Sequence, residues 1–387
     1  MKKIFQSLIN LLTRVFNYAL HLLYIQFYRK QIKRCKLSEA QLPKSRNELK
    51  REYNAKWGKL SSNINFNEVL YFARYIGYNN NIITESVCHN CIEPVLNPIR
   101  FRAYYQDKNI YEMIFPKSYL AKAFLSKRGG FYYDNGSLLK ELSDDCLSDK
   151  LKDVNKILIK PTIDSASGRG ITVWERQDNA QEFVLVNSKE NVSLDVNYLQ
   201  TNYGKDFAIQ EFLKQSPAIS RFNKSSVNTL RLATYRSVVD DSVHVLNAII
   251  RIGGENSVVD NAHAGGVFVG LFPDGTLGKY TCNQYGEVGT THNGVDFSTE
   301  NCVIPNYDKV MDFAKDVAKK VLHHRLLALD IMLDENDEPK LIEFNNNSWS
   351  TWLFQYTTSA SLGKHTDEII EYCAANKDQA EKIIFSI

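Results

Sequence analysis

Three side chains that could bind a cation lie close together in the last quarter of the sequence: Asp330, Glu343 and Asn345. Two short apolar runs, Leu326–Leu333 and Lys340–Phe344, stand on either side of a polar stretch of four residues. This pattern predicts a hairpin of two strands joined by a polar turn. Two carboxylates and an amide oxygen on such a hairpin are ligands that suit Mg²⁺.

The predicted hairpin would bring these oxygens to one side. Glu343 and Asn345 are two residues apart, so on a strand they point the same way. Asp330 comes close to them if the strands pair through the turn. A solvated edge hairpin with incidental acids is the alternative. Against it, Asp330 and Glu343 stand among apolar residues, where an unpaired acid is costly.

A second group of residues could bind phosphate. Ile157–Pro161 is predicted to be a strand, Thr162–Gly170 a loop of small residues, and Ile171–Trp174 a second strand. A loop rich in Gly and Ser lets backbone N–H groups approach phosphate oxygens, and Lys160 adds a positive charge. A hairpin with a flexible tip is the alternative. The sequence contains no Walker loop.

These two groups, in this order, resemble a known family. An Asp, a polar turn and Glu-x-Asn resemble the metal-binding end of ATP-grasp ligases, with a very similar stretch in D-alanine–D-alanine ligases. Between the groups lie Gln210-Glu211, the run Ser226–Arg231, Arg251 and the N-x-H-x-G-G motif at 261–266. The set most resembles the ATP-grasp proteins found beside sugar transferases in bacterial surface-polysaccharide gene clusters, and it covers residues from about 115 to about 360.

The resemblance implies an α+β protein with the ATP-grasp fold, in which two α/β lobes with antiparallel sheets clasp ATP, preceded by a basic amphipathic N-terminal helix. It implies four segments: a helix and linker (1–60), an N-terminal lobe (61–150), a lid subdomain (151–215), and a large subdomain with C-terminal helices (216–387). Strands are expected at Ser226–Thr234 and Val243–Ile252, a turn at Phe272–Gly275, a long loop at 279–302 and a helix at Tyr307–His324.

The resemblance also assigns roles, with ATP and Mg²⁺ as cofactors. Residues that would hold the metal are Asp330, Glu343 and Asn345. Residues that would contact phosphate are Lys117, Lys160, Ser165, Ser167, Gly168 and Gly170. Residues that would surround the adenine are Gln210, Glu211, Phe212 and Leu213. Arg251, Arg231 and His263 would act in catalysis on an acyl phosphate. Lys117 would open a helix over Ser118–Leu125, although a plain surface lysine stays an open alternative.

The activity implied is that of a carboxylate–amine ligase that forms an amide through an acyl phosphate. Its substrates would be a carboxylate and an amine, either small molecules or lipid-linked saccharides. Two alternatives stay open: a kinase that phosphorylates a hydroxyl with His263 as base, and a nucleotide-binding scaffold for glycosyltransferases.

The N-terminal segment has an unusual charge pattern. It has no Asp or Glu before Glu39, and its basic residues are Lys2, Lys3, Arg14, Arg29, Lys30, Lys33, Arg34 and Lys36. Polar residues form one stripe at helical spacing, and apolar residues cover the rest of the predicted helix. Such a helix suits a membrane interface, so we expect peripheral contact through residues 1–36, with no segment apolar enough to span a membrane cleanly. A helix packed on its own domain or in a dimer is the alternative.

Composition narrows the class of protein. The chain has 387 residues and a net charge of +3, which gives no reason to expect a nucleic-acid partner. Its seven cysteines follow no disulfide framework, which fits a reducing compartment. We therefore expect a cytoplasmic protein, peripheral on the inner face of the membrane if the N-terminal helix binds lipid. Cys88 and Cys91 form an isolated C-x-x-C pair, which we interpret as plain thiols rather than a metal or redox site.

Overall fold

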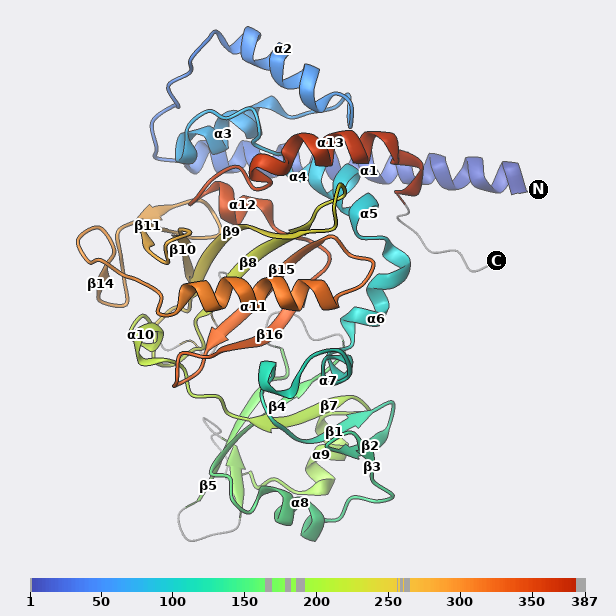
Figure 1. Cartoon of the computed structure of the whole chain (residues 1–387), viewed down its shortest axis with the longest axis vertical. Helices are drawn as coiled ribbons and strands as arrows, with labels where there is room; N and C mark the ends of the chain where they lie inside the picture. The colour runs from blue at the N-terminus through green and yellow to red at the C-terminus, as the bar shows by residue number, and fades with distance from the viewer. Residues whose placement is uncertain are drawn as a thin grey trace. The chain divides into compact units, whose positions relative to one another are not determined.

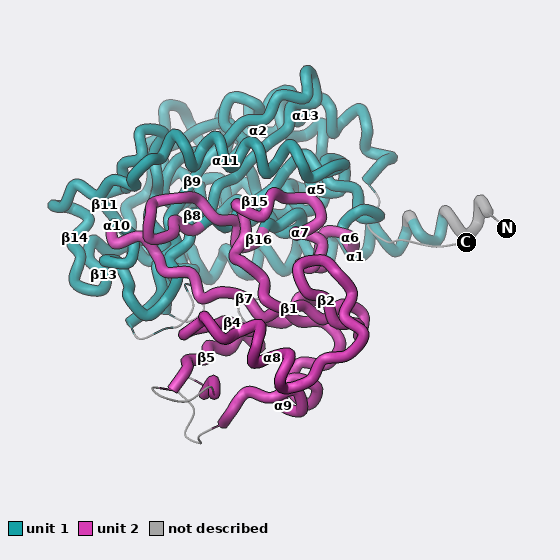
Figure 2. Tube along the Cα trace, turned by 60° about the horizontal axis from the view of Figure 1, so that its bottom comes forward, with its two compact units in different colours: residues 1–102, 218–331, 344–387 teal, residues 103–217, 332–343 magenta. Residues whose placement is uncertain are grey.

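The computed structural model describes residues 2–163, 169–177, 182–185, 192–255, 257, 260 and 265–380 (Figure 1). The chain divides into two compact units (Figure 2). Unit 1 comprises residues 1–102, 218–331 and 344–387, and unit 2 comprises residues 103–217 and 332–343. Unit 2 is thus inserted into unit 1 at two places in the sequence. The four segments expected from the sequence stay a prediction.

Unit 2 is built on a seven-stranded sheet with strand order β3-β2-β1-β7-β4-β5-β6. Its strands are β1 (Ala123–Arg128), β2 (Phe131–Asp134), β3 (Ser137–Leu138), β4 (Lys156–Pro161), β5 (Thr172–Arg176), β6 (Phe183–Leu185) and β7 (Phe207–Glu211). Every pairing is antiparallel. Its helices are α7 (Tyr111–Ile114), α8 (Asp144–Leu151) and α9 (Val196–Asn202). The core joins Ile157, Ile159 and Trp174 to apolar residues of α8 and α9.

Unit 1 holds most of a second seven-stranded sheet, with strand order β12-β11-β10-β9-β8-β15-β16. Its strands are β8 (Thr229–Arg236), β9 (Val243–Ile252), β10 (Val267–Leu271), β11 (Leu277–Cys282), β12 (Val288–Gly289), β15 (Leu326–Leu333) and β16 (Pro339–Asn345), with a separate pair β13 (Thr291–His292) and β14 (Val295–Asp296). All residues of β15 are buried, as expected for a central strand with both faces covered.

Helices cover this sheet on both faces (Figure 1). The helices assigned mainly to unit 1 are α1 (Lys2–Arg34), α2 (Arg46–Trp57), α3 (Phe66–Ile76), α4 (Glu85–Val87), α5 (Glu93–Leu96), α10 (Pro217–Ser220), α11 (Tyr307–Lys320), α12 (Thr351–Gln355) and α13 (Thr366–Ala375), with α6 (Arg102–Gln106) at the boundary. Helix α11 packs on β8 and β9. Helices α1 to α5, α12 and α13 share one apolar core with the sheet.

Short turns of 3₁₀ or π helix also occur among the described residues. They are Cys88–Ile92, Ile99–Phe101, Lys108–Ile110, Lys117–Tyr119, Gly363–His365 and Lys377–Gln379. The π turn contains Cys88 and Cys91, and all seven cysteines are free thiols.

Two local expectations were wrong. The helix expected at Ser118–Leu125 is a 3₁₀ turn followed by β1, because β1 forms backbone ladders with β2 and β7 on both sides. The loop expected at 279–302 contains the end of β11 and strands β12 to β14. Asn293 and Gly294 both have positive φ, 48° and 82°, which is the geometry of a tight two-residue hairpin.

Helix α1 forms as expected, but it contains a longer apolar segment than expected. Ser7–Arg34 is long and apolar enough, by length and composition, to cross a membrane. The contrary expectation was wrong because the helix runs unbroken through the polar residues that interrupt its apolar sequence. The same length and composition also occur in helices that lie along a membrane or pack on a protein.

Candidate active site

A buried network of charges lies on three neighbouring strands of unit 1. Arg231 on β8 stands directly opposite Asp330 on β15. Its guanidinium donates two hydrogen bonds to the carboxylate, each 2.7 Å long. The two side chains are only 12% and 3% exposed, so this is a desolvated, bidentate ion pair.

Arg251 on β9 extends the network. Its Nη1 donates to Asp330 at 3.2 Å, and its Nη2 donates to Asp260 at 2.8 Å. Asp260 also accepts hydrogen bonds from the backbone N–H and the hydroxyl of Thr229. Burial raises the pKa of Asp260, although Arg251 and Thr229 act in the opposite direction. The fold therefore brings Arg231 and Arg251 together, and both contact Asp330.

The motif that follows Asp260 is only partly described. Residues 261–264, which include His263, lie outside the described residues, so the role predicted for His263 stays a prediction. Gly265 has φ +81°, a backbone conformation that favours glycine.

Unit 2 carries the basic residues predicted to contact phosphate. Lys160 lies on β4, opposite Ala208 of β7. Burial lowers its pKa to about 8, and the nearby Lys108 acts in the same direction, while Glu343 and Glu112 oppose the shift. The lowered pKa shows that the charged form of Lys160 is destabilised by its surroundings. A negatively charged ligand beside Lys160 would stabilise that form, so the site favours an anion.

Lys108 forms an ion pair with Glu343, with 2.8 Å between Nζ and the carboxylate. The backbone N–H of Lys108 donates to the carbonyl of Thr162, directly after β4, and the Asn109 amide donates to the Thr162 hydroxyl. These bonds fix the 3₁₀ turn at Lys108–Ile110 beside the end of β4.

The loop expected to cover phosphate is described only at its end. Ser165, Ser167 and Gly168 lie outside the described residues. Gly170 has φ +75°, and a Cβ added there would lie 2.8 Å from the Pro161 ring, so the position requires glycine. Lys117 donates to the side chain of Asn135 and is exposed. No contact tests its expected role, and the helix it was expected to open is a 3₁₀ turn instead.

The residues expected around adenine lie at and after the end of β7. Glu211 closes the strand, accepts a hydrogen bond from the backbone N–H of Lys122 at 2.8 Å and donates its own N–H to the Lys122 carbonyl. Gln210 pairs with Ala123 and Leu158 on the neighbouring strands. Beyond the strand, Phe212 lies under the Lys156 ammonium, and Leu213 is partly buried. Glu211 therefore has a structural role in tying β7 to β1.

The residues expected to hold the metal lie on neighbouring strands, Asp330 on β15 and Glu343 with Asn345 on β16. Their oxygens suit Mg²⁺. The side-chain nitrogen of Asn345 is buried without a hydrogen-bond partner, a cost that a ligand at this amide would relieve. The oxygen-bearing residue types fit a divalent cation, whereas the unpaired amide N–H donor of Asn345 would be satisfied by an acceptor such as a phosphate or carboxylate oxygen. Among the described residues no group of three His, Cys, Asp or Glu side chains could hold a metal.

The segment after β16 is anchored by buried polar residues of α4 and α5. Glu93 accepts a hydrogen bond from the Trp349 N–H at 2.6 Å, and Glu85 accepts one from the Trp352 N–H at 3.1 Å. His89 lies between the two acids, 3.0 Å from Glu85 and 2.5 Å from Glu93. Burial alone would lower the pKa of His89, but its bonds to these acids raise it to about 10.

Asn97 makes a second connection to this segment. Its amide donates to the carbonyls of Leu326 and Asn346, and its oxygen accepts from the N–H groups of Arg325 and Leu326. One buried side chain therefore holds the start of β15 and the residue directly after Asn345 in a fixed relation.

The sequence did not identify two charged residues of these networks. Asp260 was visible only as the residue before the N-x-H-x-G-G motif. Lys108 stands in a polar stretch with no pattern around it. Both become recognisable only when the fold brings Arg251 to the first and Glu343 to the second.

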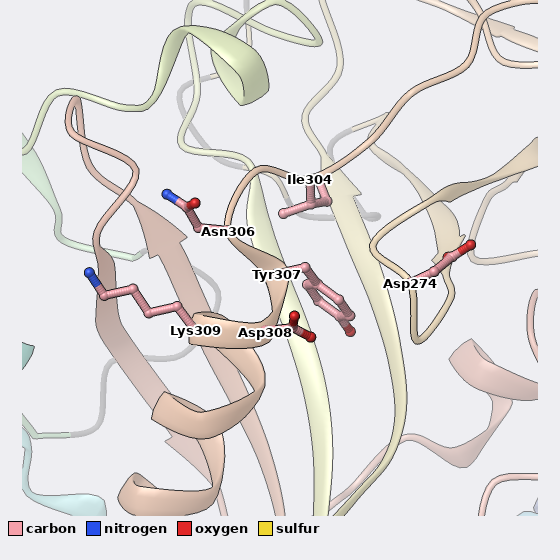
Figure 3. Close-up of a pocket in the computed structure, with 6 residues that line it drawn as sticks. All are labelled: Asp274, Ile304, Asn306, Tyr307, Asp308 and Lys309. Carbon is pink, nitrogen blue, oxygen red and sulfur yellow. The ribbon is translucent and has the colours of Figure 1, made fainter.

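A surface hollow lies elsewhere in unit 1. It has a volume of about 530 Å³ and is lined by Asp274, Ile304, Asn306, Tyr307, Asp308 and Lys309. The side chains of Asn306 and Lys309 point toward one side, and that of Asp274 points toward the other (Figure 3). The hollow contains none of the predicted site residues, and its polar groups do not converge on one point.

Solved structures give only distant matches. The ATP-grasp ligase PsnB complexed with a minimal precursor matches with a TM-score of 0.36 and 11% identity over 72% of this chain and 64% of that chain. N5-carboxyaminoimidazole ribonucleotide synthetase from Thermotoga maritima matches with 0.35 and 10%, over 69% and 49%. Biotin carboxylase from Campylobacter jejuni matches with 0.40 and 10%, over 70% and 46%. The chain covers less than two thirds of each of these chains.

The sequence itself matches a protein family. No curated protein matches it. The family model for sugar-transfer associated ATP-grasp proteins matches residues 92–371. This range contains every predicted site residue, from Lys117 to Asn345, together with both seven-stranded sheets, and it begins after α1 to α4. Because the match covers well over half of the sequence, the chain belongs to the sugar-transfer associated ATP-grasp family.

Proposed function

We propose that the protein is an ATP- and Mg²⁺-dependent carboxylate–amine ligase that acts in the synthesis or modification of cell-surface polysaccharide. Membership of an ATP-grasp family supports the nucleotide chemistry. The family description, with its reference to sugar transfer, supports the polysaccharide setting. The observation that carries the ligase proposal is the network around Asp330, where two buried guanidiniums lie on a predicted metal ligand.

In this proposal the phosphates of ATP bind Lys160 and the backbone near Gly170. A substrate carboxylate attacks the γ-phosphorus, so an acyl phosphate forms and ADP leaves. Arg251 and Arg231 stabilise the anionic oxygens of this intermediate, since fixed cations in a buried site need little reorganisation. The substrate amine then attacks the acyl carbon, loses a proton and displaces phosphate, which leaves an amide.

Asp330, Glu343 and Asn345 would hold Mg²⁺. When bound, the ion would neutralise charge on the phosphate oxygens. Asp330 and Glu343 are each paired with basic side chains, Arg231 and Arg251 for the first and Lys108 for the second. When no metal ion is bound, these basic side chains neutralise the two acids. In the proposed reaction the same basic side chains face the phosphate oxygens.

The acid and the amine are proposed only by class. An acidic sugar and an amino acid, free or on a lipid-linked precursor, would fit the family setting. A kinase and a scaffold without chemistry stay as alternatives, and the test below separates them.

The test incubates the full-length protein with ATP, Mg²⁺ and pools of uronic acids and amino acids, including lipid-linked precursors, and follows ADP, AMP and phosphate. The proposal expects ADP and phosphate in equal amounts, dependent on both an acid and an amine. The variant Glu343→Gln should lose this turnover. Glu335→Gln is the matched control, because Glu335 lies on the turn of the same hairpin, is 57% exposed and has only a 3.7 Å surface pair with Lys214.

Other products would point elsewhere. ADP without free phosphate would indicate a kinase, and AMP would contradict the acyl-phosphate mechanism. Tight ATP binding without turnover on any pool would favour a scaffold.

A further inference from the structure

Helix α1 presents its apolar side to solvent and its polar stripe to the protein. The polar residues Thr13, Asn17 and His21 recur at helical spacing along one edge of the helix, and the buried or half-buried residues Tyr24, Tyr28, Gln31 and Cys35 continue that edge. A helix that covers a soluble core normally shows the reverse arrangement.

Contacts fix which side of α1 faces the protein. The Tyr24 ring stacks on His89 with 5.9 Å between ring centroids, and His21 lies 3.4 Å from the Ser86 hydroxyl. Tyr28 is 1% exposed and packs against Tyr71 and Phe72 of α3. The second half of α1 is therefore docked on the helical layer of unit 1. Its N-terminal part projects from that layer (Figures 1 and 2).

The opposite side of α1 is a wide, mainly apolar face in which the exposed Gln26 also lies. Its side chains are 42–62% exposed: Leu8, Leu11, Leu12, Val15, Phe16, Tyr18, Leu22, Leu23 and Phe27. Single exposed apolar residues are ordinary on soluble proteins, but nine on one helix form a patch of the kind that marks an interface.

Basic residues follow the apolar face on the same side of the helix. At helical spacing, Arg29, Lys30 and Lys33 occupy the outward side directly after Phe27, and all three are exposed. The helix contains no acid. An apolar face that ends in a basic cluster complements a bilayer with anionic headgroups.

A second copy of the chain is a poorer occupant. Paired helices need a narrow seam of about two positions in seven, and the apolar face of α1 is much wider. A parallel pair would place the two basic clusters together. An antiparallel pair would set each cluster against apolar residues, and the helix has no acid to pair with it.

A membrane-crossing arrangement over the whole of Ser7–Arg34 does not fit the docked half. From His21 onward α1 contacts α3 and the α4 region, so this half lies against the protein and cannot lie inside a hydrocarbon core.

We propose that α1 is an in-plane membrane anchor. Its apolar face from Leu8 to Phe27 enters the boundary of an anionic leaflet, and Arg29, Lys30 and Lys33 contact the headgroups, whereas the Arg34 guanidinium lies over the Tyr285 ring. The polar stripe on the other side of the helix holds the protein. The proposal uses none of the residues of the proposed active site, so it stands or fails independently of the ligase chemistry.

The test measures co-flotation of the full-length protein with vesicles. Vesicles of phosphatidylcholine alone are compared with vesicles that contain about 30% phosphatidylglycerol, at about 0.1 M and about 0.5 M salt. We expect about tenfold more protein on the anionic vesicles at low salt, and a loss of most of that difference at high salt. Leu23→Asp should lower binding about tenfold, because it places a charge in the centre of the apolar face.

Matched variants make the result specific. Val239→Asp, at an apolar position that is 77% exposed and lies outside α1, should bind as the unchanged protein does. The double variant Lys30→Gln/Lys33→Gln should lose the preference for anionic vesicles and keep the fold, since both positions are exposed. If circular dichroism shows that Leu23→Asp does not fold, vesicle binding by this double variant tests the proposal in its place.

Three results would overturn the proposal. The first is full vesicle binding by both α1 variants. The second is equal, salt-insensitive binding to neutral and anionic vesicles, which would indicate insertion without headgroup recognition. The third is a dimer in solution that dissociates in Leu23→Asp with no vesicle binding, which would assign the face to a second copy.

Discussion

Each acid that the sequence suggests as a metal ligand has basic partners in the fold. Asp330 is held by Arg231 and Arg251, and Glu343 by Lys108. A buried carboxylate would otherwise be protonated or strongly destabilising. The pairing orders these acids, and the same basic side chains would contact phosphate in the proposed reaction.

The ion pair between Arg231 and Asp330 should contribute strongly to the free energy of unfolding. Arg231→Met removes the bidentate partner of a carboxylate that is 3% exposed, so we expect a loss of about 3 kcal/mol in the free energy of unfolding. Urea unfolding measures this loss. Lys152→Met removes an exposed ion pair with Asp149 and should change little. Arg231→Met/Asp330→Asn should be more stable than Arg231→Met, and a less stable double variant would contradict the explanation.

The pKa of Lys160 predicts proton uptake on nucleotide binding. Burial and Lys108 lower it to about 8 in the free protein, and bound phosphate would raise it again. Binding of ATP at pH about 9 should therefore take up about one proton, and at pH about 6.5 almost none. Isothermal titration calorimetry in two buffers of different ionisation enthalpy measures the number of protons taken up per ATP bound. Uptake that persists in Lys160→Gln would assign the proton to another group.

At the scale of elements, α4, the π turn and α5 act as a clamp on the segment after β16. Their acids bind the backbone of that segment, and Asn97 binds the residue next to Asn345. A predicted metal ligand is thus positioned by residues almost 250 positions earlier in the sequence, a relation that no local pattern contains.

Alkaline pH should weaken the attachment of the segment after β16 to α4, the π turn and α5. The pKa of His89 is raised from 6.5 to about 10, so its contribution to stability is complete below pH 6.5 and is lost as the pH rises toward 10. Relative to His89→Gln, we expect the advantage of the unchanged protein in urea unfolding to shrink by about 2–4 kcal/mol between pH about 6.5 and about 9.5. His292→Gln, which removes an imidazole bonded to a single carbonyl, should leave the dependence intact. An advantage that stays constant with pH would show that His89 acts through packing alone.

The elements that the sequence predicted well are those with strong patterns of their own. Val243–Ile252 is β9 to the residue, and the hairpin of β15 and β16 follows from its apolar runs and polar turn. The prediction of an ATP-grasp fold with antiparallel sheets is confirmed. Local pattern failed at Ser118–Leu125, where pairing with two distant strands overrides helical spacing. It also missed Asp260 and Lys108, because an ion pair between distant segments leaves no periodicity in either.

At the scale of the whole molecule, the core that unit 1 forms with α1 to α5, α12 and α13 draws on both ends of the chain. Buried residues from Tyr28 of α1 to Cys373 of α13 belong to the same cluster, together with Ala233 and Ala328 of the sheet. Unit 2 has a separate core around Ile159. Packing, rather than proximity in sequence, therefore defines the cooperative units.

Native-state hydrogen exchange should reveal two groups of amides. Ile369→Ala creates a cavity at a fully buried position of α13 and should lower protection in α3, β8 and β15 by about 2–4 kcal/mol, while β4 and β7 keep theirs. Ile159→Ala should do the converse, since Ile159 lies in the core of unit 2. Equal loss of protection in both sheets for either variant would mean that the two cores unfold as one.

The interleaving of the units gives them different completion times during synthesis. The ribosome has made every strand of the unit 2 sheet by Glu211, but the core of unit 1 waits for Cys373, more than 150 residues later. Because domains generally fold in the order in which they are synthesised, we expect unit 2 to fold first, before the rest of unit 1 has been made. During that interval α1 has emerged before α12 and α13, which share its core, so a membrane surface would meet its apolar face before the body of unit 1 exists.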